Sequence, residues 1–66
     1  MNALIRLRND AQWTKIECER LIGGIQIMGP SEITDCIIEG ASVELRLESG
    51  TEKVGFVKKD GLIEFQ

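Results

Sequence analysis

Residues 42–66, which read SVELRLESGTEKVGFVKKDGLIEFQ, give the clearest indication of the fold. From Val43 to Glu48 apolar and charged side chains alternate without a break. Because successive side chains of a β-strand point to opposite faces, this period of two places Val43, Leu45 and Leu47 together. The pattern predicts a strand with one face packed on a core and the other in water.

Two turn signals divide the rest of this segment. Ser49-Gly50 and Asp60-Gly61 each suit a tight hairpin, and Asp60-Gly61 is the stronger signal because both residues tolerate a positive φ. Two-residue loops at both places predict an antiparallel three-strand meander in which Phe56 lies opposite Phe65. The inward face would consist of Val43, Leu45, Leu47, Val54, Phe56, Ile63 and Phe65, with Val57 and Leu62 on the other face as a second packing surface.

Residues 10–22 fit two structures. As a helix they have Asp10 as N-cap, but their apolar side chains scatter round the helical wheel. As a strand they alternate with two exceptions, and Gly23-Gly24 then forms a tight turn. We favour a hairpin over residues 14–28 and keep a helix at about 10–22 as the alternative. In the hairpin, one face carries Ile16, Cys18, Ile22, Ile25 and Ile27.

The N-terminal residues show the same alternation. Ala3, Ile5 and Leu7 take every second position, although Leu4 between them blurs the pattern. This spacing predicts a first strand, and Asn9-Asp10 after it predicts a turn.

The segment around Pro30 interrupts the strand pattern, because proline lacks the N–H that a β-ladder needs. Ser31 after it suits the cap of a single helical turn, as an alternative to extended chain. Further on, Cys36-Ile37-Ile38 is apolar at consecutive positions. It predicts a short strand over residues 33–39 that is buried on both faces.

These segments add up to six or seven short strands in one domain that spans residues 1–66. A chain of this length buries only about 60% of its unfolded surface, so its core is small. We therefore expect an all-β fold, either a small barrel or a tight sandwich of antiparallel strands with a C-terminal meander. If residues 10–22 are helical, the fold is α+β instead.

Composition limits the chemistry that the chain supports. The net charge is −3 and there is no histidine, which excludes Ser-His-Asp and Cys-His catalysis and argues against a phosphate-binding surface. Cys18 and Cys36 are too few for a structural zinc site. We expect both cysteines to be buried, reduced thiols, with a disulfide as the alternative, and we expect no cofactor and no bound metal.

The expected location is the cytoplasm. No stretch has the ~18 consecutive apolar residues of a membrane span. The N-terminus also lacks an apolar segment of signal-peptide length. We therefore expect a protein that does not contact a membrane.

The residues that suggest a function are acidic or aromatic side chains on the predicted strands. Acidic side chains on neighbouring strands would form one surface suited to a basic partner protein. Trp13 follows a polar turn and is either an exposed anchor for a partner or a plug at one end of the barrel. The predicted partner-binding residues are Trp13, Glu17, Glu19, Glu44 and Glu48.

The sequence thus favours a non-enzymatic protein-binding module, of the inhibitor or adaptor type that phages and other mobile elements direct against a host protein. An enzyme is the least expected class. One alternative is a small nucleic-acid-binding barrel, for which Phe56 among Lys53, Lys58 and Lys59 is the basic and aromatic signal. Nucleic acid is not the preferred partner, because the chain is acidic. Another alternative is a homo-oligomeric structural subunit.

A dimer or larger oligomer is the expected state in solution. A core this small leaves apolar side chains on nominally outward faces, and association covers them. Light scattering at micromolar concentration should therefore give a multiple of 7.4 kDa, and the mass of a single chain would contradict the prediction. The side chains expected at the contact are Leu4, Leu21, Val57 and Leu62.

Overall fold

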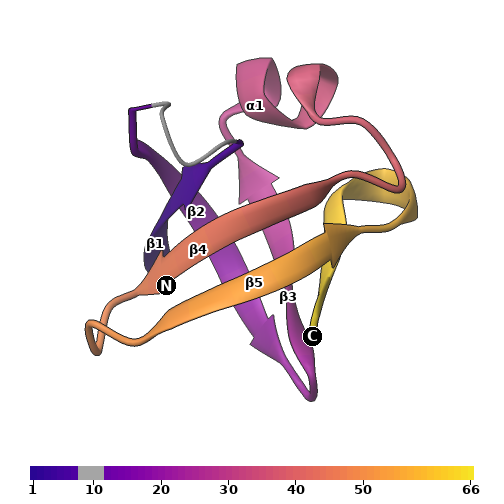
Figure 1. Ribbon diagram of the computed structural model, residues 1–66. Helices are drawn as coiled ribbons and strands as arrows, with labels where there is room; N and C mark the ends of the chain where they lie inside the picture. Colours follow the sequence, from indigo (N-terminus) through magenta and orange to yellow (C-terminus); the bar gives the residue numbers. More distant parts are fainter. Residues whose placement is uncertain (8–11) are drawn as a thin grey trace.

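The computed structural model describes residues 1–7 and 12–66, in which six antiparallel strands close into a barrel with one short helix (Figure 1). The predicted small all-β barrel is confirmed. The α+β alternative with a helix at about 10–22 is wrong, and the predicted turn at Asn9-Asp10 lies outside the described residues. In chain order the elements are β1 (Asn2–Arg6), β2 (Thr14–Leu21), β3 (Gly24–Gly29), α1 (Ser31–Cys36), β4 (Ser42–Leu47), β5 (Glu52–Val57), the single 3-10 turn η1 (Lys59–Gly61) and β6 (Leu62–Phe65).

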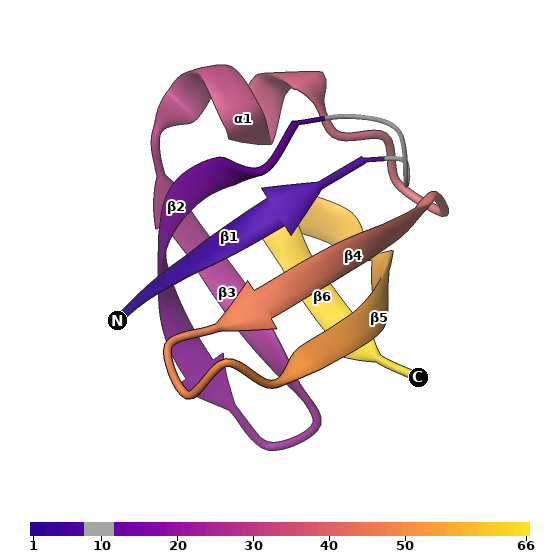
Figure 2. The same cartoon turned by 60° about the vertical axis from the view of Figure 1, so that its left-hand side comes forward.

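Two three-strand meanders, β1-β2-β3 and β4-β5-β6, join at both edges to close the barrel in the order β1-β2-β3-β6-β5-β4. At one seam β1 pairs with β4, with Ala3 opposite Leu47 and Ile5 opposite Leu45. At the other seam β3 pairs with β6. Each described strand therefore has a hydrogen-bonded neighbour on both sides, which leaves none of them an open edge. Figure 2 shows α1 across one end of the barrel and the β2–β3 turn at the other.

The core is built from every second residue of the strands, as the sequence period predicts. Ile25, Leu45 and Ile63 have no exposed surface at all. Burying side chains of this size contributes roughly 1.5–3 kcal/mol each, so closure of the barrel around them dominates its stability. The buried apolar side chains are Ala3, Ile5, Ile16, Cys18, Ile25, Ile27, Val43, Leu45, Leu47, Val57 and Ile63.

The two hairpins of the C-terminal meander turn where predicted, but each loop has three residues instead of two. Around the first loop the Leu47 amide donates to the Thr51 carbonyl at 2.9 Å, and Gly50 takes the positive φ of 89° with which such loops end. The second loop is Lys59–Gly61. The additional residue shifts the pairing of β5 by one, and a shift of one turns every side chain to the opposite face.

This shift corrects the predicted inward face. Phe56 lies opposite Glu64 rather than Phe65. Phe56 and Val54 point to solvent, with 37% and 43% of their surface exposed. Val57, predicted on an outer surface, belongs to the core. The reason is that the same turn dipeptides fit loops of two or three residues, and the packing of the barrel decides between them.

The predicted hairpin over residues 14–28 is confirmed as β2 and β3. Its turn, however, consists of Ile22-Gly23 rather than Gly23-Gly24. Ile22 is therefore fully exposed at the tip instead of facing the core. The second glycine is part of β3, where it passes close to the backbone of β6.

The predicted strand over residues 33–39 is wrong, because the chain forms α1 there. Ile33 on α1 and Ile37, the extended residue that follows the helix, both pack against the core. Cys36 and Ile38, predicted to be buried, lie at the surface, with Ile38 73% exposed. Of the apolar run Cys36-Ile37-Ile38, only Ile37 packs against the core.

The close approach of Gly24 to β6 generates a test of the β3–β6 seam. A Cβ atom at position 24 would overlap the carbonyl oxygen of Ile63, a backbone atom that cannot move without disturbing the pairing. Gly24→Ala should therefore lower the free energy of unfolding by about 3 kcal/mol or more, the upper end for overpacking. Chemical denaturation measures the change.

Gly29→Ala is the matched control, because a Cβ atom there meets no other atom within 4 Å. We expect the control to stay within about 1 kcal/mol of the parent protein. If the two variants were equally stable, the described contact between β3 and β6 would be incorrect.

Candidate functional site

Closure of the barrel places β1 between β2 and β4, so the outward side chains of these three strands form one surface. They stand in rows that cross the strands. In the middle row Leu4 lies between Lys15 and Arg46, and in the row beside it Arg6 lies opposite Glu44. This surface is called the β1 face and comprises Asn2, Leu4, Arg6, Trp13, Lys15, Glu17, Glu44, Arg46 and Glu48.

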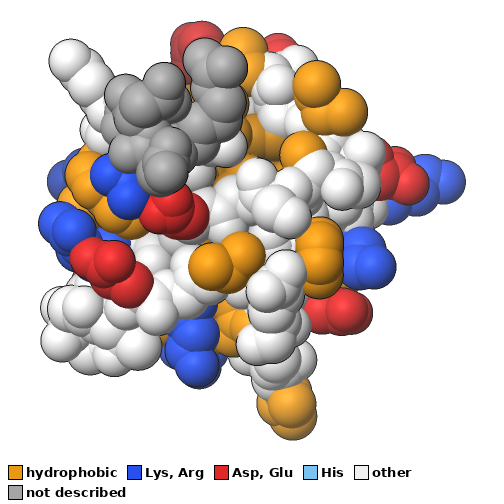
Figure 3. All heavy atoms as spheres, in the orientation of Figure 1, with side chains coloured by type: hydrophobic (Ala, Val, Ile, Leu, Met, Phe, Trp, Pro, Cys, Tyr) orange, Lys and Arg blue, Asp and Glu red, His pale blue; other side chains and the backbone are white. Residues whose placement is uncertain are grey.

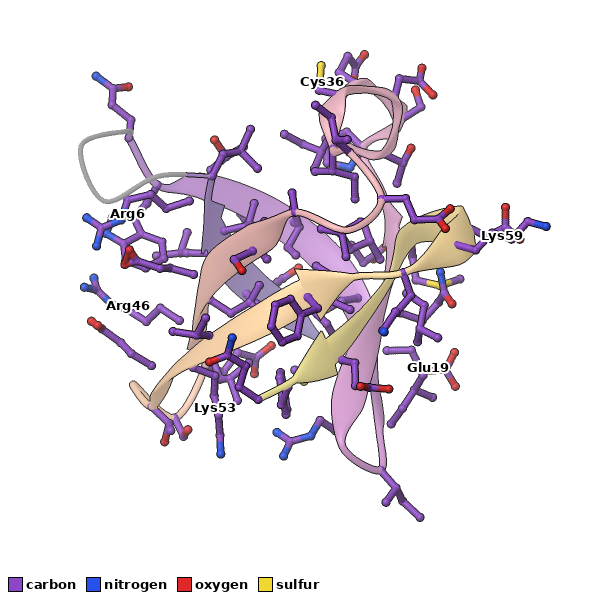
Figure 4. The ribbon with its side chains drawn as sticks, turned by 45° about the vertical axis from the view of Figure 1, so that its right-hand side comes forward. Arg6, Glu19, Cys36, Arg46, Lys53 and Lys59 are labelled. Carbon is purple, nitrogen blue, oxygen red and sulfur yellow. The ribbon has the colours of Figure 1, made fainter. Side chains whose placement is uncertain are left out.

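Trp13, the only tryptophan of the chain, is half-buried on the β1 face between two arginines. The guanidinium carbon of Arg6 lies 4.4 Å from the centre of the indole ring, and that of Arg46 lies 4.6 Å from it. Cation–π contacts of this kind contribute roughly 0.5–1 kcal/mol each at exposed sites. Figure 4 shows both arginines on the same side of the barrel. The ring is therefore held in one place on the outside of β1.

Each of these two arginines also forms an ion pair with a carboxylate. Arg6 Nη2 donates to Glu44 Oε2 at 2.6 Å. Arg46 donates to Glu52 Oε2 from Nε at 3.0 Å and from Nη2 at 2.6 Å. In Figure 3 basic and acidic side chains accordingly lie next to one another along the left edge of the molecule. Exposed ion pairs add little stability, but these two fix the guanidinium planes against the ring.

A hollow of about 280 Å³ opens beside Arg46, between β1 and β4. Leu4, Lys15, Arg46 and Glu48 line it from the β1 face, and its floor reaches the buried core residues Ala3 and Leu47. The volume is below the roughly 300–1,000 Å³ of pockets that enclose small molecules. It therefore suits a single side chain of a partner better than a metabolite.

The structure places three of the four predicted acidic residues on the β1 face and the fourth, Glu19, elsewhere on the barrel. Asn2 lies between Glu17 on β2 and Glu48 after β4, and the Asn2 amide donates to Glu48. Glu44 is engaged in its ion pair on the same face. Glu19 projects from the opposite side of the barrel to the two labelled arginines (Figure 4). Among the residues that the structure describes, Glu17 and Glu48 are thus the acidic side chains of the β1 face without an ion pair to arginine.

Phe65, and not Trp13, is the aromatic side chain that packs against the core, so Trp13 is not the plug that one alternative supposed. Phe65 packs against the core, and its ring centre lies 5.1 Å from the guanidinium carbon of Arg20 and 5.5 Å from Lys53 Nζ. Lys59 stands at a different place on the barrel from Lys53 (Figure 4). The lysines that suggested a nucleic-acid groove are therefore not gathered into one.

Five residues of the β1 face, Asn2, Leu4, Arg6, Lys15 and Arg46, were absent from the predicted partner-binding residues. The outward orientation of Arg6 and Arg46 could have been predicted, because the alternation of apolar and charged residues places both on the solvent face of their strands. Leu4 lies on β1 with Arg6, and Lys15 joins them through the pairing of β1 with β2. Arg46 joins them only because β1 and β4 are neighbours. No local pattern in the sequence specifies that pairing.

The two cysteines differ in their exposure to solvent. Cys18 is buried, as predicted, whereas Cys36 is exposed, contrary to the prediction, and neither forms a disulfide. Burial raises the pKa of the Cys18 thiol above its ordinary value of 9.0. Because the thiolate is the reactive form, Cys18 is unreactive in the folded protein for two reasons, access and protonation.

Alkylation of the native protein with iodoacetamide at pH 8 should therefore modify Cys36 alone, and Cys36→Ser should abolish the fast reaction. Cys18 should react only on unfolding. Since the folded pKa of Cys18 is raised, the protonated thiol favours the fold, and stability should decline as the pH rises through 9.0 and beyond. Intact-mass measurement follows the reaction. Equal rates at the two cysteines would contradict the placement of β2.

Within residues 1–7 and 12–66, no group of three or more acidic, histidine or cysteine side chains is arranged to hold a metal ion. The same residues contain no helix with the length and apolar character needed to cross a membrane. The chain matches no model of a protein family, no curated protein and no solved structure. The β1 face is therefore the basis on which a function is proposed.

Proposed function

We propose that this protein is a non-enzymatic protein-binding module that contacts its partner through the β1 face. The observation that carries the proposal is Trp13, held on the outer surface between Arg6 and Arg46. Tryptophan and arginine are among the residue types most enriched at the positions that dominate protein–protein affinity. Side chains that are fixed before binding also lose less conformational freedom in the complex.

The closed barrel limits the ways in which a partner protein can bind. Strand addition, in which a partner extends a sheet, needs an open edge, and none of the described strands has one. A partner must therefore meet side chains on the outside of the barrel. The β1 face supplies an aromatic anchor, Trp13, and a separate hollow next to Arg46 that receives a side chain of the partner. An inhibitor or adaptor that works by occupying a surface of its target needs nothing more.

The electrostatics of the β1 face favour a protein over a nucleic acid as the partner. Each arginine that flanks Trp13 already neutralises a carboxylate, Glu44 or Glu52. Affinity for nucleic acid comes largely from cations that are free to replace the counterions of phosphates. Glu17 and Glu48 on the same face would in addition repel a phosphate backbone.

Trp13→Ala tests the proposal. Loss of two cation–π contacts should cost about 1–2 kcal/mol of stability and leave the barrel folded, which circular dichroism checks. Loss of the anchor should cost at least ~2 kcal/mol of binding, or about thirtyfold in Kd. Parent and variant proteins are immobilised side by side, the partner is identified from a lysate of the encoding organism, and its Kd is then measured with purified components.

Phe56→Ala is the matched control, because Phe56 is also a partly exposed aromatic side chain but lies on β5, outside the β1 face. The partner should bind this variant with nearly the parent affinity. If Phe56→Ala abolished binding while Trp13→Ala left it unchanged, the contact surface would be β5 and the proposed role of the β1 face would be wrong.

A further inference from the structure

The outward side chains of β5 form a row that the β1 face does not include. Val54 and Phe56 stand at its centre, and both are exposed to solvent. The buried residues Gly55 and Val57 alternate with them, as the period of two requires. In the orientation of Figure 1 β5 crosses the front of the barrel, and Figure 3 shows apolar side chains exposed on that front. This row is called the β5 row and consists of Glu52, Val54, Phe56 and Lys58.

The β5 row carries opposite charges at its two ends, with the apolar pair between them. One end is Glu52 and the other is Lys58. Both nitrogens of Arg46 that bind Glu52 donate to Oε2, so the second oxygen of this carboxylate can accept a further hydrogen bond. A partner of uniform charge would be attracted at one end of the row and repelled at the other. A second copy of the same row, turned end for end, is matched at both ends.

Two-fold symmetry produces this match. Sheets that pack face to face keep their strands nearly aligned, so β5 of one copy lies over β5 of the other either antiparallel or parallel. In the antiparallel case the two-fold axis passes between Val54 and Phe56, and Val54 of each copy faces Phe56 of the other. Glu52 then faces Lys58 of the other copy, and each contact occurs twice because both copies use the same surface. The parallel case would place like charges against each other.

The strands on either side of β5 fit the same antiparallel arrangement. On the β4 side of the apolar pair stand Ser42 and Glu44. On the β6 side stand Glu64 and Gln66, and the backbone amide of Gln66 donates to the Val54 carbonyl at 2.9 Å. The two-fold axis brings Glu44 over Ser42 and Glu64 over Gln66. In both pairs a carboxylate meets a hydroxyl or side-chain amide that can donate a hydrogen bond, so the surface around the β5 row is complementary to itself.

We propose that two copies of this chain associate face to face through the β5 row, antiparallel and about a two-fold axis between Val54 and Phe56. The outside of a barrel is convex, so the contact is limited to β5 and the strands beside it, at the low end of specific interface sizes. The dimer should therefore dissociate on dilution. The inference goes beyond the proposed function, because it names a second surface on the far side of β4 from β1.

Sedimentation velocity from micromolar to millimolar concentration tests the proposal. The mass of the parent protein should rise with concentration toward twice 7.4 kDa. Phe56→Ala removes an apolar contact that occurs twice in the dimer, and it should raise the dissociation constant by about tenfold or more. Ile22→Ala is the matched control, because Ile22 is a fully exposed apolar side chain in the β2–β3 turn. The control should leave the dissociation constant unchanged.

Charge reversal at the ends of the β5 row tests the antiparallel arrangement. Glu52→Lys and Lys58→Glu should each raise the dissociation constant by about tenfold or more, because two attractive contacts become repulsive. Lys58→Glu is the cleaner of the two, since Glu52 also binds Arg46. An equal mixture of the two variants should dimerise again, because each end then meets its opposite. Lys59→Glu is the matched control, since it changes the net charge equally at a neighbouring position in η1, outside the row (Figure 4).

Nuclear Overhauser effects (NOEs) between copies locate the contact directly. In a dimer of one isotope-labelled and one unlabelled copy, the Phe56 ring should show NOEs to the Val54 methyl groups of the other copy. The mass of one chain at every concentration would overturn the inference. So would a dimer without these NOEs, or equal dissociation constants for Lys58→Glu and the Lys59→Glu control.

Discussion

Pairing of β1 with β4 is the constraint on which the rest of this structure depends. It joins residues that are far apart in the chain, with Ala3 opposite Leu47 and Ile5 opposite Leu45. An isolated meander of three short strands has little core of its own, and a chain of 66 residues has no second layer to cover it. Closure lets the inward faces of both meanders form one core and gives the outer strands of each a hydrogen-bonding partner.

The same pairing creates the β1 face. Trp13 comes from the segment before β2, Arg6 from β1 and Arg46 from β4, and they meet only because these strands are neighbours. The sizes of the energies distinguish the contacts on the β1 face from those that stabilise the fold. Each exposed ion pair or cation–π contact on the face contributes up to about 1 kcal/mol, whereas one buried core side chain contributes roughly 1.5–3 kcal/mol. These contacts contribute little to the fold, which is why we propose that the arrangement of the arginines around the ring serves binding.

The sequence predicts those features that depend on neighbouring residues, and fails for those that depend on contacts between distant segments. The period of two identified the strands and the inward faces of Val43, Leu45 and Leu47, because that signal is local. It failed for Phe56 and Val57, because a loop longer by one residue reverses a strand while leaving its turn dipeptide unchanged. The sequence could not predict that the β1 face forms, because strand order depends on contacts between distant segments. Trp13, Glu17, Glu44 and Glu48 were named individually, but not the arginines that unite them.

The most direct test of a partner contact at the β1 face uses the indole N–H signal of Trp13, which is unique because the chain has one tryptophan. Its position is followed in ¹⁵N-labelled protein as the unlabelled partner is added. We expect the indole signal to shift or broaden in step with the amides of Leu4, Arg6 and Arg46. An indole signal that stays in place while the amides around Phe56 move would contradict the account.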